Sequence, residues 1–205
     1  MKNVKPLPRL TLRAESAMMT RRRIAEAARL LFFANGYAAT TLQEVATEAG
    51  VAVQTIYAVY GSKVGILRAL RDLAINQADA EAASPGSMRA ATLGESLDQF
   101  GHSIRLRWEL AGDIVRILDD AGKADTAIRE EVEVALRARR GGIAQLAKNL
   151  DERFGLAIDP KRAAAILLAL TLPELHSEFI DIHGWTEDEY ETWLAAAMRK
   201  ELLGR

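Results

Sequence analysis

The stretch TLQEVATEAGVAVQTIYAVYGSK, residues 41–63, decides the fold of the first part of this chain. Thr41 followed three residues later by Glu44 is a capping box, so a helix is expected to begin directly after Thr41. Gly50 supplies the left-handed backbone conformation with which many helices end. A second helix is expected over residues 53–60. Two short helices joined by a tight turn at a glycine form a helix-turn-helix.

The second helix of this motif carries side chains suited to contacting base pairs. Ile56 and Tyr60 fall on its inner side. Its outer side then presents Val53, Gln54 and Thr55. A glutamine can form paired hydrogen bonds with adenine, and the methyl groups of Val and Thr can pack against a thymine methyl. We therefore interpret it as a DNA-recognition helix, the alternative being an ordinary helical hairpin.

Two further residues of the motif are placed to contact the DNA backbone. Tyr57, at the edge of the second helix, can donate its hydroxyl to a phosphate. Lys63 follows the expected N-cap Ser62 and lies in the first turn of the next helix. A cation there opposes the helix dipole unless an anion is bound nearby, and a DNA phosphate would be such an anion.

A wider pattern extends through this region, with matching residues Phe33, Gly36, Tyr37, Thr41, Val45, Ala46, Ala49, Gly50, Val51, Thr55, Ile56, Tyr57, Tyr60 and Lys63. Residues 20–71 thereby resemble the N-terminal domain of the tetracycline repressor (TetR) family. In that family the motif binds operator DNA. The resemblance implies that the DNA-contacting positions are Thr41, Gln54, Thr55, Tyr57 and Lys63. One departure is Ala52, which stands where many members have the serine N-cap of the recognition helix.

Lysine and arginine are concentrated near the start of the chain. Residues 1–71 hold 11 Lys or Arg against 4 Asp or Glu, whereas residues 72–205 hold 16 against 24. A positive part joined to an acidic part is expected for a DNA-binding domain on a body that does not bind DNA. Arg21 opens a run of three arginines, and we include it among the expected DNA contacts. We interpret residues 1–15 as a flexible basic arm, which either contacts DNA or stays in solvent.

The composition and patterning of the chain predict an all-α fold, with two domains after the basic arm. Aromatic residues are 6% of the chain, and strand-like alternation is almost absent. We expect a helix-turn-helix DNA-binding domain over residues 16–65 and a helical regulatory and dimerisation domain over residues 66–205.

Glycines and prolines divide the second domain into helices. The first expected helix begins after Ser62 and runs to about residue 83. Further helices are expected over residues 88–108, then to about residue 121, and over residues 125–154.

The last two expected helices predict a dimer. The segment AAAILLALTL, residues 163–172, is apolar on almost every side, so a helix there must be buried all round. The core of one subunit would cover only part of it. Pro173 is expected to interrupt it. With the final helix, residues 187–203, it predicts a four-helix interface between two copies, with contact residues Ile166, Leu170, Trp193, Leu194 and Ala197. The alternative is that these helices complete a monomer core. The TetR resemblance also implies a dimer of this kind.

The resemblance implies, in addition, a small-molecule pocket among the body helices, whose occupation releases DNA. Our candidate ligand contacts are Phe100, Trp108 and His176. A buried tryptophan is more often a core residue, and a lone histidine is more often a satisfied polar group, so these residues also have a structural interpretation.

Composition argues against other classes of protein. Without cysteine there are no disulfides, thiolate metal sites or cysteine nucleophiles. The three histidines lack metal-ligand spacing, and no phosphate-binding loop or nucleophile elbow is present. We expect no metal, no cofactor and no enzymatic activity. Apolar runs are too short for a signal peptide or a membrane helix, which favours a cytoplasmic bacterial protein.

The sequence thus predicts a DNA-binding transcriptional regulator. We expect a homodimeric repressor that binds a palindromic double-stranded operator and is released by a small-molecule effector. Two alternatives remain: a helical ligand-binding protein without specific DNA recognition, and a non-specific architectural DNA binder.

Overall fold

The computed structural model describes residues 12–82 and 90–204, which form helices and connecting turns without a strand. These residues fall into two compact units that divide between Leu70 and Arg71. The division lies inside a helix, somewhat later than the boundary at residues 65 and 66 that the sequence predicted.

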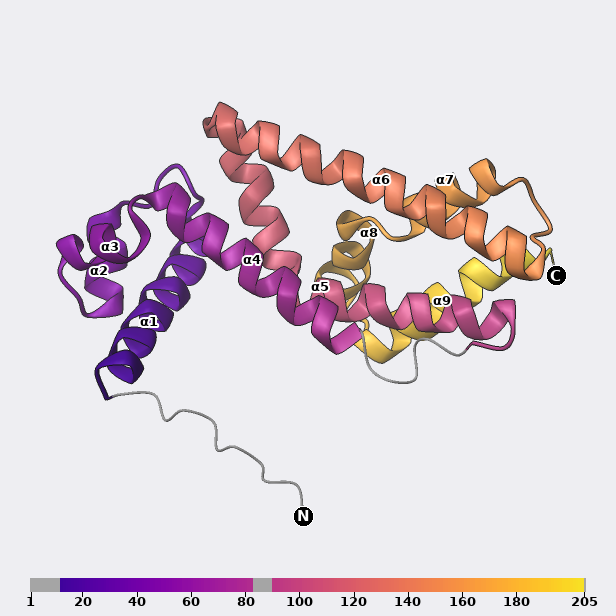
Figure 1. The fold of residues 1–205 in the computed structure, drawn as a ribbon, viewed down its shortest axis with the longest axis horizontal. Coiled ribbons are helices and arrows are strands. Elements are labelled where there is room, and N and C mark those ends of the chain that lie inside the picture. Colours follow the sequence, from indigo (N-terminus) through magenta and orange to yellow (C-terminus); the bar gives the residue numbers. More distant parts are fainter. Residues whose placement is uncertain (1–11, 83–89, 205) are drawn as a thin grey trace, which may run out of the picture. The chain divides into compact units, whose positions relative to one another are not determined.

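Four helices contribute to the N-terminal unit: α1 (Leu12–Asn35), α2 (Leu42–Ala49), α3 (Val53–Tyr60) and the first part of α4 (Lys63–Ala82) (Figure 1). Helix α2 packs on α1, and α3 packs on α2. Their apolar faces meet in a core that includes Ile24, Ala28, Phe32, Val45, Ile56, Ile66 and Leu67, each at most 2% exposed. This core fixes the angle of the two short helices to α1.

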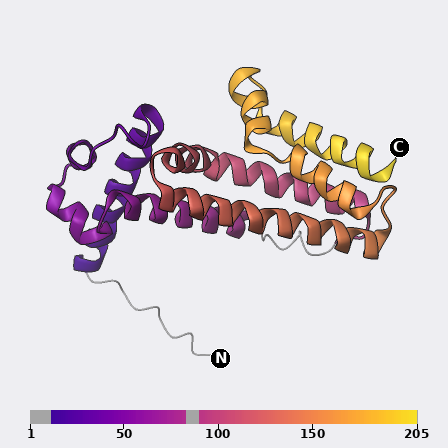
Figure 2. The ribbon, with the colours of Figure 1, turned by 90° about the horizontal axis from the view of Figure 1, so that it is seen from above.

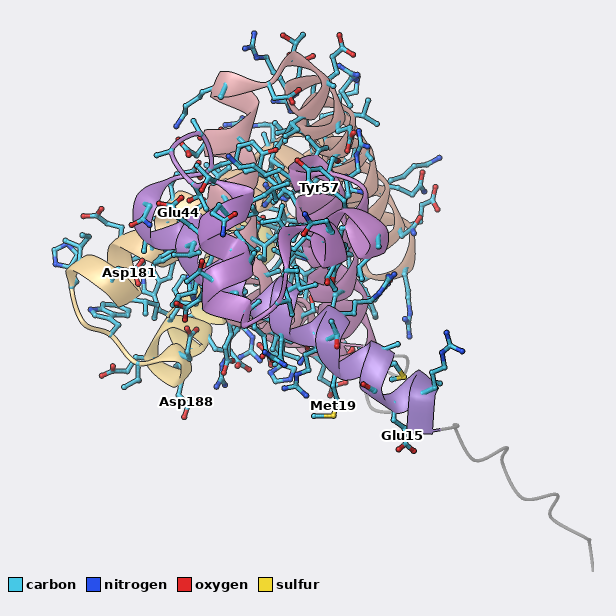
Figure 3. The ribbon with its side chains drawn as sticks, turned by 90° about the vertical axis from the view of Figure 1, so that its left-hand side faces the viewer. Glu15, Met19, Glu44, Tyr57, Asp181 and Asp188 are labelled. Carbon is cyan, nitrogen blue, oxygen red and sulfur yellow. The ribbon has the colours of Figure 1, made fainter. Side chains whose placement is uncertain are left out.

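The first helix begins earlier than expected. Of the basic arm predicted over residues 1–15, residues 1–11 lie outside the described part of the chain. Residues 12–15 are already helical, because α1 begins at Leu12. Glu15 lies in the first turn of α1, where its negative charge suits the positive end of the helix dipole. Figure 3 shows Glu15 and Met19 on the outer end of this helix.

The C-terminal unit contains the rest of α4 followed by α5 (Leu93–Ala124), α6 (Thr126–Phe154), α7 (Pro160–Leu170), α8 (Pro173–Ser177), the π-helical turn η1 (Glu178–Ile182) and α9 (Glu187–Leu203). Helix α5 packs on α6, α6 on α7, α7 on α9, and α9 back on α5. In Figure 2, α7 and α9 form a second layer over α5 and α6. The buried core between these helices includes Leu97, Trp108, Leu167, Tyr190 and Leu194.

Helix α5 corrects one expectation. The sequence predicted two helices, over residues 88–108 and ending near residue 121, but α5 is a single helix of 32 residues. It bends partway along its length without losing its helical backbone (Figure 1). The one buried face continues through the expected break, from Trp108 to Ala111 and Ile114, and this continuous packing holds the two halves together.

The break at Pro173 was predicted and is confirmed. Helix α7 ends at Leu170, and Pro173 occupies the first turn of α8, where its missing N–H removes no hydrogen bond. In the described part of the chain, no single helix is long and apolar enough to cross a membrane. Helix α7 with the segment Pro173–Ile182 passes that test of length and composition only as a pair bent by 42°.

Helix α9 begins and ends where the sequence predicted. Thr186 and Glu189 form a capping box, with the Thr186 N–H donating to the carboxylate over 2.7 Å and the Glu189 N–H donating to the threonine hydroxyl over 3.2 Å. Ion pairs then fasten α9 to α5. Arg105 contacts Asp188 at 2.7 Å and Glu191 at 3.1 Å.

Candidate nucleic-acid interface

Helix α2 starts with the predicted capping box. The Glu44 N–H donates to the Thr41 hydroxyl over 3.2 Å, and the Thr41 N–H donates to the Glu44 carboxylate over 2.7 Å. That backbone hydrogen bond, with a second from the Thr41 hydroxyl, lowers the pKa of Glu44. The helix ends at Gly50, whose φ of 62° and ψ of 44° are left-handed as predicted. Thr41 is exposed, but its hydroxyl is occupied by the cap.

Helix α3 spans the residues expected of a recognition helix. Ile56 is fully buried beneath it, while Gln54 and Tyr57 are exposed. Val53 and Thr55 are half-buried, so their methyl groups are only partly available to a groove. Ala52 has the extended backbone of an N-cap, φ −77° and ψ 149°, and makes no side-chain capping bond. Figure 3 labels Tyr57 on α3 and Glu44 on α2.

Arg21 holds the end of α3. Its guanidinium donates to the carbonyl of Val59 over 3.1 Å and lies over the ring of Tyr60, 5.2 Å from the centroid. The Tyr60 hydroxyl donates back to the carbonyl of Arg21 over 2.9 Å. Arg21 therefore satisfies a carbonyl that the helix end leaves without a partner, and α1 is tied to α3 by a reciprocal pair of bonds. The prediction that Arg21 contacts DNA rests on its charge alone.

Arg23 has the same role at the end of α2, which the sequence reasoning missed. Its guanidinium donates to the carbonyl of Ala49 and, over 3.1 Å, to that of Gly50. Arg21 and Arg23 thus cap the ends of both short helices. Arg22 points elsewhere, forming an ion pair of 2.6 Å with Glu26 on α1. Only the helical periodicity of α1, which turns successive side chains by about 100°, could have suggested this division.

Lys63 lies over aromatic rings. Its ammonium nitrogen is 4.3 Å from the centroid of Tyr37 and 5.8 Å from that of Phe32, and it donates to the carbonyl of Ala38 over 3.4 Å. Burial lowers the pKa of Lys63, and the charge of Glu44 partly offsets this effect. The predicted N-cap is present, since the Gly65 N–H donates to the Ser62 hydroxyl over 3.0 Å. Lys63 therefore braces the connection between α1 and α2.

The sequence of this N-terminal unit matches a known protein family. Residues 24–70 match the model of the bacterial regulatory proteins of the tetR family. This unit belongs to the TetR family. The match runs from α1 to the middle of α4 and so covers the whole helix-turn-helix. No curated protein matches the chain in sequence.

Solved structures extend the likeness to the whole TetR-family fold. A TetR-like transcriptional regulator from Rhodococcus sp. RHA1 has a TM-score of 0.67 at 17% identity, with 96% of this chain and 100% of that chain covered. A putative regulator from Saccharomonospora viridis, in complex with choline, has a TM-score of 0.66 at 21% identity over 90% and 98%. The regulator FadR from Bacillus subtilis, in complex with stearoyl-CoA, has a TM-score of 0.65 at 15% identity over 86% and 96%.

The candidate ligand residues lie in the core of the C-terminal unit. Trp108 and His176 are buried, and Phe100 is half-buried against the same core. The ring of His176 meets Tyr190 edge-on at 4.9 Å, and its Nε2 lies 3.0 Å from the carboxylate of Glu187. His176 therefore has a hydrogen-bond partner within its own chain.

The candidate dimer residues divide into two groups. Ile166, Leu170, Trp193 and Ala197 are half-buried on α7 and α9. Leu194 is a correction: it is fully buried between the helices of its own chain and cannot contact another copy. Its position on α9, one turn after Tyr190 and one before Met198, places it on the inner face of that helix.

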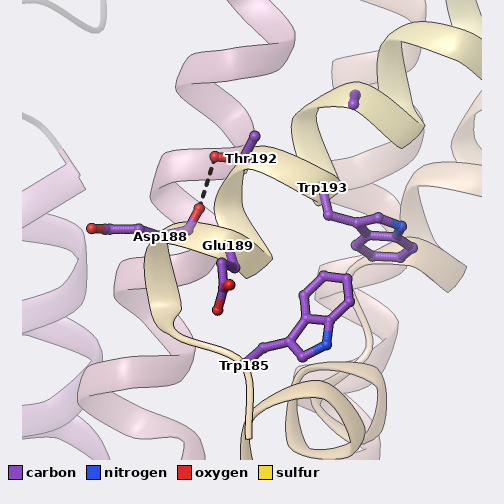
Figure 4. Close-up of a pocket in the computed structure, with 6 residues that line it drawn as sticks. Trp185, Asp188, Glu189, Thr192 and Trp193 are labelled. Atoms are coloured by element: carbon purple, nitrogen blue, oxygen red, sulfur yellow. Dashed lines mark hydrogen bonds between the residues drawn. The ribbon is translucent and has the colours of Figure 1, made fainter. Parts of the chain in front are cut away.

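An open groove lies on the outer side of α9. It has a volume of about 480 Å³ and is lined by Trp185, Asp188, Glu189, Thr192, Trp193 and Ala196. In Figure 4 the two indoles lie beside each other, and the Thr192 hydroxyl donates to the carbonyl of Asp188 over 2.8 Å. Its exposed lining is mostly apolar and includes Trp193, one of the residues predicted to contact a second copy.

Proposed function

We propose that this protein acts in the bacterial cytoplasm as a homodimeric transcriptional repressor, which binds a palindromic operator and is released by a small-molecule effector. The observation that carries the proposal is the helix-turn-helix of α2 and α3, whose outer face exposes Gln54 and Tyr57 over a fully buried Ile56. Membership of the unit in a family of regulators supports it.

The exposed side of α3 supports contact with a major groove. Gln54 can bond adenine through two hydrogen bonds, and the partly exposed Val53 and Thr55 offer methyl groups to thymine. Tyr57 is 55% exposed and can donate its hydroxyl to a phosphate. Because Arg21 and Lys63 are engaged inside the unit, we assign them to positioning the recognition helix. Thr41 keeps its exposed position at the start of α2 and remains a proposed backbone contact.

The outer face of α7 and α9 supports dimerisation. Ala165 and Ala169 on α7 and Ala196 on α9 are exposed, and such small side chains let helices approach closely. Together with Ile166, Leu170, Trp193 and Ala197, they form a surface that a twofold copy would cover. A dimer would present two recognition helices to half-sites roughly 34 Å apart, one turn of DNA.

Small-molecule response is supported by relatives of the same fold. One solved structure contains choline and another stearoyl-CoA. In this chain the C-terminal unit carries the buried Trp108 and His176, with Phe100 beside them, and we propose that its core receives the effector.

The test is selection of binding sites from a pool of random duplexes by the full-length protein at near-physiological salt, followed by sequencing. We expect enrichment of a palindrome. The matched control is Gln54→Ala, which removes one exposed side chain of α3 and is expected to relax the preference at one position in each half-site. Loss of one good bidentate contact costs about 1–3 kcal/mol of discrimination.

Each other outcome contradicts the proposal in a defined way. Tight binding without an enriched sequence would identify a non-specific architectural protein, with affinity falling steeply as salt rises. No binding to any duplex would favour the other alternative, a helical ligand-binding protein whose helix-turn-helix does not recognise DNA.

A further inference from the structure

Three hydrogen-bond donors from three helices lie in the C-terminal unit, two of them on residues of its buried core. They are the indole N–H of Trp108 on α5, the guanidinium of Arg139 on α6 and the phenol of Tyr190 on α9. The guanidinium carbon of Arg139 lies 5.6 Å from the ring centroid of Trp108. Its charge also acts on Tyr190. We call these three residues the donor cluster.

Arg139 is a half-buried cation with few acceptors. One of its nitrogens donates to the carbonyl of Thr171 and, over 2.8 Å, to the Thr171 hydroxyl. That hydroxyl in turn donates to the carbonyl of Leu167 over 2.7 Å. Among the described residues Arg139 forms no ion pair. A guanidinium has five N–H donors, so Arg139 can donate further hydrogen bonds beyond those to Thr171.

The other two donors are fully withdrawn from solvent and have no partner in the described part of the chain. This holds for Nε1 of Trp108, a residue 6% exposed, and for the hydroxyl of Tyr190, a residue 0% exposed. Leaving a buried donor without an acceptor costs free energy, so such groups are uncommon and call for an explanation. Both residues are near Arg139, so a bound acceptor in this part of the core would offer these donors a partner.

Charged residues of both signs act on the cluster, and its own cation is Arg139. Burial lowers the pKa of Arg139, and the charge of Arg107 lowers it further, while Glu174 and Tyr190 act in the opposite direction. Burial and Glu187 raise the pKa of Tyr190, which therefore keeps its proton and remains a donor. The carboxylate of Glu187 is already paired with His176 at 3.0 Å.

We propose that the donor cluster binds the carboxylate of a small-molecule effector with an apolar body. A carboxylate has only acceptors, takes two parallel bonds from a guanidinium, and can accept further bonds from an indole and a phenol. The surrounding buried residues, among them Leu167 and Leu194, are apolar and suit the remainder of such a molecule. This inference rests on the proposed ligand response and specifies its chemistry.

The test uses matched pairs of probes that differ in charge. Octanoate and benzoate, their neutral amides octanamide and benzamide, and the cation choline are titrated into the full-length protein by calorimetry. At least one carboxylate is expected to bind ten times or more tightly than its amide, because a hydrogen bond to a charged group is stronger than one to a neutral group. Choline is expected not to bind the cluster.

Two variants connect binding to the cluster. Tyr190→Phe removes only an unpartnered hydroxyl, so the ligand-free protein is expected to keep or raise its melting temperature while carboxylate affinity falls about tenfold. Arg139→Gln is expected to abolish carboxylate binding. Arg140→Gln, at the neighbouring exposed position of α6, is the control and is expected to bind as the parent does.

The inference is overturned if carboxylates and amides bind equally, if no carboxylate binds, or if Tyr190→Phe binds as tightly as the parent. The proposed function is tested separately by adding the bound carboxylate to the protein on its selected operator. Carboxylate binding that leaves the operator complex intact would refute the proposed release by this ligand while leaving the donor cluster established.

Discussion

Gly50 adopts a backbone conformation that other residues reach only with strain, φ 62° and ψ 44°. A Cβ there would also lie 2.6 Å from the nearest guanidinium nitrogen of Arg23, so this guanidinium would have to shift from its bonds to the carbonyls of Ala49 and Gly50. We expect Gly50→Ala to lower the free energy of unfolding by about 1 kcal/mol, mainly through the left-handed backbone. Urea denaturation, monitored by circular dichroism, measures this change in the free energy of unfolding.

The control for this prediction is a glycine inside a helix. Gly141 lies in the middle of α6, where a Cβ would have nothing within 4 Å. Because alanine favours a helix interior over glycine by up to about 1 kcal/mol, Gly141→Ala is expected to stabilise the protein. The explanation given for Gly50 fails if the two substitutions shift stability in the same direction.

Arg21 is expected to act on DNA binding through α3. In Arg21→Met, the bond to the Val59 carbonyl and the cation over Tyr60 are lost, so α3 is held less firmly. Affinity for the selected operator is expected to fall about tenfold, a typical effect of losing one charged hydrogen bond. The slope of log affinity against log salt is expected to stay unchanged, because no phosphate contact disappears.

The salt slope separates this role from a direct contact. If Arg21 binds a phosphate, the slope of the Arg21→Met variant drops by about one. Tyr60→Phe removes the return bond to Arg21 without changing any charge, and it is expected to weaken operator binding in the same direction. Arg22→Met, at an exposed position paired with Glu26, shows what losing one surface cation does by itself.

Among the elements, α3 lacks a side-chain cap. Ala52 already has an extended N-cap backbone but no oxygen to offer the first N–H groups of the helix. Ala52→Ser is expected to raise the free energy of unfolding by about 1 kcal/mol, the usual value of such a cap. Ala58→Ser, at an exposed position inside α3, is the control and is expected to bring no gain. Thermal unfolding of the two variants compares them.

Helix α2 is expected to weaken in acid. The pKa of Glu44 is lowered from its ordinary value of 4.5 by the Thr41 N–H and hydroxyl, so its contribution to stability is complete above that value. It is lost as pH falls through the lowered pKa, because the protonated carboxyl accepts the capping bonds poorly. An NMR titration of the Glu44 carboxyl measures this pKa. Glu44→Gln is expected to remove the associated pH dependence, and a pKa at or above 4.5 would contradict the capping geometry.

Helix ends were the most predictable part of the fold. Thr41, Gly50, Ser62 and Thr186 each carry a local signal, since a cap depends on residues within one turn. The continuity of α5 was not predictable in this way. Its two halves are joined by a buried face whose partners lie on α6 and α9, far away in the sequence.

In the candidate site, too, the local features were predictable from the sequence and the long-range contacts were not. The buried Ile56 and the exposed Gln54 and Tyr57 follow from helical periodicity. The engagement of Arg21 does not, because a charge count treats an arginine that caps a helix and one that faces DNA alike. The acceptor of Arg21 is the backbone of Val59, and a backbone carbonyl leaves no trace in the sequence.

At the scale of the molecule, the outer face of α7 is expected to decide the oligomeric state. Ala169 is exposed on that face. If a second copy covers it, Ala169→Glu buries a charge without a partner, which costs several kcal/mol. Light scattering is expected to show the parent at twice the chain mass of 22.5 kDa and the variant at that mass. Operator affinity is expected to fall with it.

The matched control is Ala144→Glu, at an exposed position on α6 outside the proposed interface. It is expected to remain dimeric and to bind the operator as the parent does. A parent protein that is monomeric at micromolar concentration would contradict the proposed interface, as would an Ala169→Glu variant that stays dimeric.

Because the boundary between the two units falls inside α4, they cannot be exchanged at a loop. Ile66, Leu67 and Leu70 are buried on one side of the boundary, and Arg71 pairs with Glu131 at 2.7 Å on the other. A hybrid protein that joins this N-terminal unit to the C-terminal unit of another regulator therefore needs its junction after Leu70. The junction must also keep the residue count, because one inserted residue turns the rest of an α-helix by about 100°.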